Sequence, residues 1–307
     1  MRTTKLLALA LVLGASSLNV ALATPAQALP APDRGGSACV QGDGGASARG
    51  GHGADHRAIS AKEQRAIARQ TKARLQQKGV TRAELRSTSV SVPVYVHVMA
   101  AEDGAGNVSN KVIARQIAVL NNTFAGGESS TAADTGFSFT LAGTDRYFND
   151  TWHQDHSSAN YRAATRRGGA NALNIWLVDF KLLGVATFPW DYAKNGAIDG
   201  IRVHYASLPG GAIANYDKGE TATHEAGHWF GLYHTFQGGC TELNDEVSDT
   251  PAQSSPTNGC PVGRDSCSLP GLDPIHNYMD YSYDTCYTEF TSGQTTRAQS
   301  MWAAYRG

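Results

Sequence analysis

The stretch HEAGHWFGLYH, which begins at His224, constrains the fold more than any other part of the sequence. Residues four apart share one face of an α-helix, so His224 and His228 can direct two imidazoles at one point. His234 reaches the same point only if the helix ends and the chain turns back, and Gly231 permits this turn because glycine tolerates positive φ. The spacing therefore predicts a helix that ends in a turn, with three side chains converging on one ion.

This donor set is typical of a catalytic zinc site. Zn²⁺ binds nitrogen ligands in a roughly tetrahedral arrangement at about 2.0–2.1 Å, and a catalytic site keeps one position open for water. Glu225 is expected at the flank of the metal, where its carboxylate can take a proton from that water. Core histidines that only satisfy one another are the alternative, but the extended motif fixes five positions at once. We predict one catalytic zinc ion held by His224, His228 and His234.

Residues 1–28 are typical of a secretory signal peptide. Arg2 and Lys5 give a positive start, an apolar run follows, and Ala26-Gln27-Ala28 is a small-residue cleavage site, with Ala21-Leu22-Ala23 as a competing cut. Polar residues interrupt this run, so it is not hydrophobic enough for a membrane span of about 20 residues, and no later segment could cross a bilayer. A buried N-terminal helix is the alternative interpretation. We expect a secreted, extracellular protein without a membrane partner.

Charge divides the rest of the chain into two parts. Residues 29–88 carry eleven Lys and Arg against five Asp and Glu, whereas residues 89–307 carry thirteen against twenty-two. Opposite fields attract, so we interpret residues 29–88 as a propeptide that docks on a catalytic domain at 89–307. A basic arm that binds nucleic acid is the alternative. Export argues against a nucleic-acid partner.

Hydrophobic periodicity predicts the main elements. Residues 29–56 have little apolar content and are typical of a flexible segment. Valines alternate over 90–98, which predicts a strand, and Ser109 precedes a helix with an apolar stripe that ends at Phe124. The remaining predictions are an exposed helix from Ser60, capped with Glu63, to about Lys78, strands at 136–141, 173–178 and 201–205, an edge strand at 182–187, the zinc-motif helix at 218–232, and a final helix capped by Thr291 and Gln294.

Five cysteines remain in a chain that we expect in an oxidising compartment. Cys240, Cys260, Cys267 and Cys286 lie close together near the C-terminus, whereas Cys39 stands alone. Two disulfides and one unpaired thiol are the natural count. The sequence allows three ways to pair the four late cysteines.

The zinc motif is similar to that of the metzincins, and NYMDY, which begins at Asn277, resembles their Met-turn with Met279 beneath the metal. More narrowly, residues 219–294 resemble the pappalysin family. The marks are HEAGHWFGLYHTF followed by GGC, the segment DTP at Asp249, NYMDYS shortly before Cys286, and the final FTSGQ. This is a long, ordered match over about a quarter of the chain.

The resemblance implies an α+β, metzincin-like fold. A twisted mixed β-sheet and two main helices would form an upper subdomain, followed by an irregular, disulfide-linked lower subdomain and a C-terminal helix. The implied function is a zinc-dependent endopeptidase, made as a latent precursor, in which Glu225 assists the attack of a zinc-bound water. Peptide substrates would add to the edge strand at 182–187. Tyr281 would hydrogen-bond the tetrahedral intermediate, and a packed aromatic is the alternative.

Disulfide pairing and calcium binding are also implied by the resemblance. The family positions pair Cys240 with Cys267 and Cys260 with Cys286. Asp245, Asp249 and Thr250 lie in the loop where relatives bind calcium, and oxygen ligands of this kind suit Ca²⁺. Solvated loop carboxylates are the alternative.

Cys39 and Asp284 carry two further hypotheses. A thiolate is a strong zinc ligand, so Cys39 is a candidate latency switch; it lacks the neighbouring Arg expected of such a switch, and a stray thiol is the alternative. Asp284 lies near the pocket for the residue after the scissile bond, where relatives with a carboxylate prefer Arg or Lys. An Asp that caps a turn is the alternative.

The rival function is a zinc-containing binding protein without turnover. A purely structural zinc site is closed by a fourth ligand and has no use for Glu225. A zinc hydrolase acting on non-peptide amides is a second rival. We predict a monomeric enzyme that acts on protein or peptide substrates and binds its own propeptide.

Overall fold

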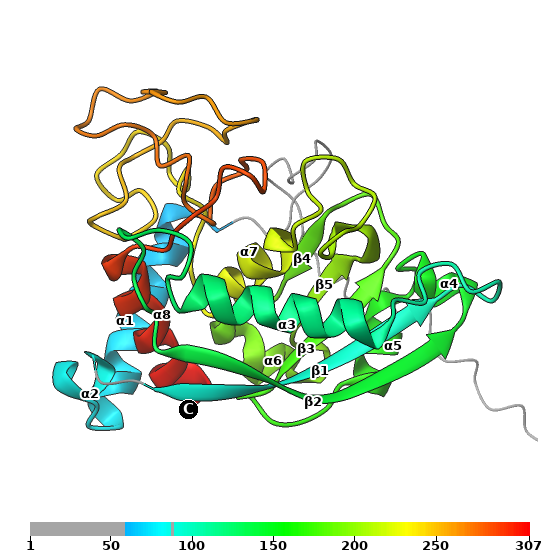
Figure 1. Cartoon of the computed structure of the whole chain (residues 1–307). Helices are drawn as coiled ribbons and strands as arrows, with labels where there is room; N and C mark the ends of the chain where they lie inside the picture. The colour runs from blue at the N-terminus through cyan, green and yellow to red at the C-terminus, as the bar shows by residue number, and fades with distance from the viewer. Residues whose placement is uncertain (1–58, 87–88) are drawn as a thin grey trace, which may run out of the picture. The chain divides into compact units, whose positions relative to one another are not determined.

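The computed structural model describes residues 59–86 and 89–307. Its centre is a five-stranded sheet in the order β2-β1-β3-β5-β4 (Figure 1). Four strands run parallel, and β4 runs antiparallel to β5 at one edge, so the sheet is mixed as predicted. The strands are β1 (Val90–Ala100), β2 (Phe137–Phe148), β3 (Leu173–Val178), β4 (Gly184–Ala186) and β5 (Ile201–His204).

The alternating valines place β1 at the centre of the hydrophobic core. Val92, Val94, Val96 and Val98 are buried in one cluster with apolar side chains of α3 (Asn110–Phe124) and α7 (Glu220–Trp229). The Ser109 side chain accepts a hydrogen bond from the Val112 amide and so begins α3 as predicted. The helix α7 is shorter than the predicted 218–232. Its first and last turns are bounded by Gly219 and Gly231, which both adopt positive φ.

Two short helices that the sequence did not predict lie against the other face of the sheet. These are α4 (Asp150–His153) and α5 (Ser158–Thr165), and Tyr161 of α5 packs with Met99 and Trp176 of the sheet in a second buried cluster. All six residues of β3 are buried as a result. The remaining short elements are α2 (Arg82–Arg86), α6 (Tyr192–Asn195) and the 3₁₀ turns Pro189–Asp191, Gly196–Ile198 and Tyr205–Ser207.

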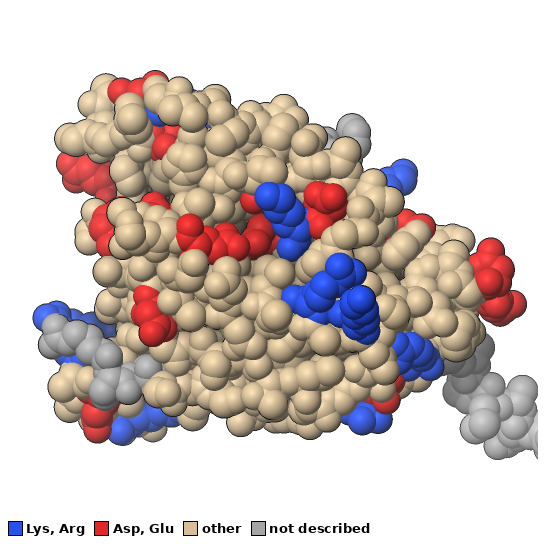
Figure 2. Space-filling model, in the orientation of Figure 1, with Lys and Arg blue, Asp and Glu red and all other residues tan. Residues whose placement is uncertain are grey.

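Residues 235–291 form the lower subdomain, which contains no helix and only two isolated β-bridges (yellow to orange in Figure 1). Two disulfides, Cys240–Cys267 and Cys260–Cys286, cross-link it. This is the pairing that the family resemblance implied. On the face shown in Figure 2, Asp and Glu side chains gather between α3 and these loops, in keeping with the excess of acidic residues over 89–307.

The C-terminal helix α8 (Ser292–Tyr305) begins with the predicted capping box of Thr291 and Gln294. The helix α1 (Ala61–Gln77) begins after Ser60, as predicted, and packs beside α8 (Figure 1). The expectation that α1 is exposed is wrong on one face. Ile67 is buried in a cluster with Phe188 and Met301, and the Thr71 hydroxyl lies 3.0 Å from that of Tyr305. The sequence did not predict this contact because α1 contains too few apolar residues to show a helical period.

Candidate metal centre

The helix α7 presents two of the three predicted ligands on one face. His224 and His228 lie one turn apart, and the chain turns back at Gly231, whose φ is +93°. This turn brings Nε2 of His234 to 3.2 Å from Nε2 of His224 and 3.0 Å from Nε2 of His228. All three side chains are buried. The three histidines therefore meet at one point, and the positive φ at Gly231 is the backbone feature that allows it.

Hydrogen bonds to carbonyl groups orient two of these rings. Nδ1 of His224 donates to the Tyr278 carbonyl oxygen at 2.6 Å, and Nδ1 of His228 donates to the Leu232 carbonyl oxygen at 2.8 Å. A neutral imidazole carries one proton, so Nε2 of each ring presents a lone pair towards His234. Tetrahedral zinc with bonds of about 2.0–2.1 Å separates its nitrogen ligands by about 3.3 Å. The side chains present thus fit a zinc ion.

The carboxylate of Glu225 lies between α7 and the edge strand. The side chain is buried, and a Cβ added to Gly184 of β4 would lie 2.3 Å from its Oε1. Only glycine leaves room for the carboxylate at this point. Gly184 was missed as a functional residue, although a glycine inside a predicted strand signals a close approach of another group.

Residues 277–281 form a turn next to the histidines. A Cβ added to Gly227 would lie 2.3 Å from Sδ of Met279, so this glycine of the zinc motif makes room for the methionine. The Tyr281 ring centroid lies 4.9 Å from that of His234 and 5.7 Å from that of His224. The structure thus places Tyr281 beside the rings of His224 and His234, and Met279 against Gly227 of the same motif.

Comparison with known proteins decides the family. The family model for peptidase M43, described as pregnancy-associated plasma protein-A, matches residues 179–303. An extracellular metalloprotease of Neurospora crassa is 46% identical over 245 residues, which cover 77% of this chain and 82% of that protein. An extracellular metalloprotease of Podospora anserina is 47% identical over 238 residues, which cover 74% of this chain and 78% of that protein. The chain belongs to the pappalysin family.

Solved structures of this family agree. Mature mirolysin of Tannerella forsythia in complex with a cleaved peptide is 31% identical with a TM-score of 0.61, covering 69% of this chain and 91% of that one. A promirolysin variant of Tannerella forsythia is 30% identical with a TM-score of 0.67, and the match covers 79% of this chain and 88% of that one. The protein is therefore an extracellular zinc metallopeptidase with a metzincin-like fold. Among the described helices, none is long and apolar enough to span a membrane.

The structure brings together two of the three residues predicted to bind calcium. Asp245 is buried, and its Oδ1 accepts from the Thr250 hydroxyl at 2.7 Å, whereas its Oδ2 has no hydrogen-bond partner in the described part of the chain. Burial raises the pKa of Asp245 to about 7. Asp249 instead accepts from the Thr291 hydroxyl at 2.7 Å and from the Gly293 amide at 2.8 Å, at the start of α8.

Asp284 is buried beside the segment that leads into α7. Its Oδ2 accepts from the Lys218 amide at 2.9 Å, and its own amide donates to the Asn215 carbonyl at 3.0 Å. This contact corresponds to the capping role that was the alternative to substrate recognition. Cys39 and residues 1–28, the predicted signal peptide, lie outside the described residues.

Proposed function

We propose that the protein is a zinc-dependent endopeptidase, made as a latent precursor, in which Glu225 assists the attack of water on a peptide bond. The observation that carries this proposal is the convergence of the three histidine Nε2 atoms, with the Glu225 carboxylate placed between the same helix and β4. When bound, zinc would polarise the scissile carbonyl and acidify a water molecule.

Two side chains complete the proposed mechanism. Glu225 accepts a proton from the attacking water and passes it to the leaving amine, which is general base and then general acid catalysis. Tyr281, whose ring lies beside that of His234, donates a hydrogen bond to the oxyanion that develops on the substrate carbonyl. The burial of Glu225 keeps competing water away from its carboxylate.

The edge strand β4 suggests how the substrate binds. Among the described strands it pairs only with β5, and it ends the strand order. We propose that a peptide adds here in extended form, which brings its scissile bond to Glu225 because Gly184 contacts that side chain. The mirolysin structure with a cleaved peptide supports a peptide as the substrate class. We also propose that the enzyme acts on protein or peptide substrates as a monomer, without nucleic-acid or membrane partners.

For the precursor we propose a signal peptide at 1–28, a propeptide at 29–88 and a catalytic domain at 89–307. The match with promirolysin covers 79% of this chain and that with mature mirolysin 69%, which supports a propeptide that includes α1. The Ile59 carbonyl accepts from Nε2 of Gln237, three residues after His234, at 2.8 Å. The chain therefore enters the described region close to the metal centre.

Cys39 is the proposed source of latency. Cys39 lies twenty positions before Ile59, and an extended chain spans about 3.3 Å per residue, so the thiolate can reach the zinc. There it would take the fourth ligand position. Cys39→Ala should raise the activity of the uncut precursor, measured with a quenched fluorescent peptide. A variant precursor as latent as wild type would contradict this role.

We further propose a calcium ion at Asp245. Its buried Oδ2 without a protein partner, beside the Thr250 hydroxyl, supports a cation at this place. Asp249, the third residue of the predicted set, contacts α8 instead. Exhaustive calcium chelation that leaves zinc bound should lower the melting temperature and the activity. If both stayed unchanged, the calcium proposal would fail.

The remaining proposal concerns substrate preference. We propose that the enzyme cleaves before Arg or Lys and that the buried carboxylate of Asp284 sets this preference. Asp284→Asn should reduce the preference in a cleavage profile on a peptide library. An unchanged profile, together with a lower stability, would assign Asp284 to the capping of the Lys218 segment alone.

The main test compares processed wild type with Glu225→Ala on mixed denatured proteins, followed by mapping of new termini. Wild type should cleave, and a zinc chelator should abolish cleavage. The variant should keep stoichiometric zinc but lose hydrolysis, whereas Glu102→Ala, at an exposed glutamate, should behave as wild type. Wild type that binds zinc without any turnover would favour a zinc-containing binding protein. Wild type without stoichiometric zinc would contradict the proposal.

A further inference from the structure

A buried amide connects the third histidine with the turn that carries Tyr281. Gln253 is fully buried in the lower subdomain. Its Oε1 accepts from the hydroxyl of Thr235, the residue after His234, at 2.9 Å. Its Nε2 donates to Oδ1 of Asp280, the residue before Tyr281, at 3.0 Å. One side chain therefore contacts the neighbours of two residues of the metal centre.

Asp280 extends this contact to the backbone of Tyr281. Its Oδ1 also accepts from the Tyr281 amide at 2.8 Å. The Thr235 amide donates to the Met279 carbonyl at 3.2 Å, which closes a ring of hydrogen bonds through Gln253. Thr235 and Asp280 are fully buried, so water does not compete for these bonds. Gln253 therefore links the segment that contains His234 to the segment that contains Tyr281.

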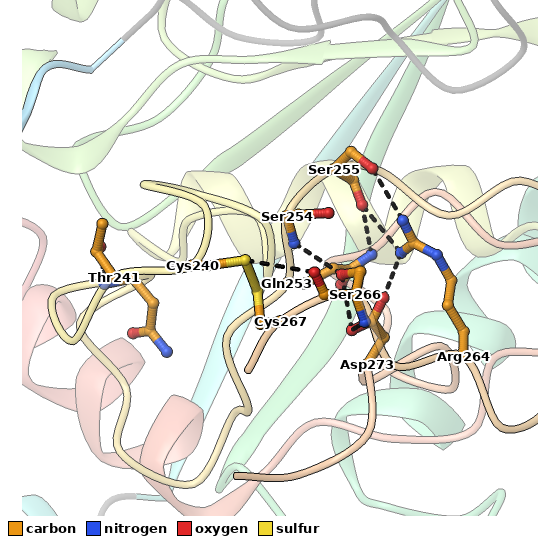
Figure 3. The surroundings of a disulfide bond; sticks show 10 residues. Cys240, Thr241, Gln253, Ser254, Ser255, Arg264, Ser266, Cys267 and Asp273 are labelled. Atoms are coloured by element: carbon orange, nitrogen blue, oxygen red, sulfur yellow. Dashed lines mark hydrogen bonds and ion pairs between the residues drawn. A yellow bond between two sulfur atoms is a disulfide. The ribbon is translucent and has the colours of Figure 1, made fainter. Parts of the chain in front are cut away.

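The loops of the lower subdomain hold Gln253 in place (Figure 3). Its Nε2 also donates to the Ser255 carbonyl at 2.9 Å, and Nη1 of Arg264 donates to the same carbonyl at 3.0 Å. Arg264 in turn forms an ion pair with the buried carboxylate of Asp273. The Cys240–Cys267 disulfide lies next to this group in Figure 3. Gln253 is thus part of the cross-linked framework rather than of a free loop.

We propose that Gln253 is a positioning residue that fixes His234 and Tyr281 in one geometry. The proposal rests on the proposed function, because it takes His234 as a metal ligand and Tyr281 as a catalytic residue. The Asp280 carboxylate and the Ser255 carbonyl accept hydrogen bonds from Nε2 of Gln253, and the Thr235 hydroxyl donates one to Oε1. An amide satisfies all three groups because it carries both a donor and an acceptor. Outer partners of metal ligands typically change metal affinity or activity about 10- to 100-fold when removed.

Gln253→Glu is the test variant, because it keeps the size of the side chain but replaces the donor towards Asp280 with a second carboxylate. We expect kcat to fall about 10- to 100-fold with little change in KM. We also expect the visible spectrum of the cobalt-substituted protein to shift, since His234 would change its position. Thr235→Val removes only the hydroxyl donor and should give smaller effects in the same direction. This second variant decides the question if Gln253→Glu does not fold.

Gln299→Glu is the matched control. Gln299 is a buried glutamine of α8 whose Nε2 donates to the Thr135 carbonyl at 3.0 Å, and its substitution should leave kcat and the cobalt spectrum unchanged. The proposal is overturned if Thr235→Val and any folded Gln253→Glu keep kcat within about twofold and the wild-type spectrum. Loss of the proposed function would look different: wild type itself would then lack hydrolysis, while the cobalt spectra would still report on Gln253.

Discussion

The upper subdomain, residues 89–234, and the lower subdomain, residues 235–291, are stabilised by different interactions. In the first, apolar side chains of the sheet, α3 and α7 form one large buried cluster, and the strands pair in a regular order. In the second, two disulfides and buried polar side chains such as Gln253 and Asp280 hold irregular loops. The metal centre takes its histidines from the first and Tyr281 from the second. In the proposed mechanism, catalysis therefore depends on two regions that different chemistry can disrupt.

The largest effect is expected where the two subdomains share one core. Phe124 of α3 is fully buried, and its ring centroid lies 4.9 Å from that of Phe139 in the sheet and 4.9 Å from that of Phe290 in the lower subdomain. Phe124→Ala should lower the free energy of unfolding by about 3–5 kcal/mol, because it removes a large apolar side chain and leaves a cavity. Chemical denaturation followed by circular dichroism measures this loss.

Phe148→Ala is the matched control for this prediction, since Phe148 is 53% exposed. It should change the free energy of unfolding by about 0.5 kcal/mol or less. Similar values for the two variants would mean that the aromatic cluster around Phe124 does not join the subdomains.

The lower subdomain should respond to pH through Asp245. Burial raises its pKa from 3.8 to about 7, so between these values the folded state holds a proton that the unfolded state has released. The free energy of unfolding of calcium-free protein should therefore fall as pH rises from about 4 to about 7, by roughly 3–4 kcal/mol. Above pH 7, where the carboxylate is ionised, added calcium should restore stability.

Asp245→Asn supplies the control for the pH prediction, because an amide does not titrate. Denaturation curves at several pH values, with and without calcium, should differ between wild type and this variant. If the two proteins showed the same pH dependence, another group would carry the effect.

Reduction should separate the two subdomains most clearly. The disulfides join residues 27 and 26 positions apart, and loop closure gives each about 3 kcal/mol. Hydrogen exchange after reduction should accelerate for amides of residues 235–291, while amides of β1 and α3 stay protected. Equal acceleration in both subdomains would show that the chain unfolds as one unit.

The same contrast explains what the sequence could predict. Periodicity is a local signal, so the valines of β1 and the stripe of α3 predicted their elements and the face that each buries. The helices α4 and α5 were not predicted because they are too short to show a hydrophobic period. The spacing from His224 to His234 predicted the convergence of the rings because helix geometry and one glycine fix it.

The lower subdomain left few local signals. The cysteine count predicted two disulfides, but their pairing came from the family resemblance, since loop sequences do not fix which ends meet. The contacts of Gln253 with Thr235 and Asp280 join residues far apart in the chain, and no periodic pattern in the sequence predicts them. Gly184 and Gly227 were visible in the sequence, but the atoms for which they leave room are defined only by the fold.

Asp249 gives the smallest expected effect and separates two roles of the lower subdomain. Its carboxylate accepts from Thr291 and Gly293 and so satisfies the start of α8, where the helix dipole favours a negative charge. Asp249→Ala should lower the free energy of unfolding by about 1 kcal/mol, equally with and without calcium, while Asp265→Ala at an exposed carboxylate should change little. A loss confined to calcium-containing buffer would make Asp249 a calcium ligand, as the family resemblance implied. Equal losses would show that this loop stabilises the C-terminal helix directly, without help from an ion.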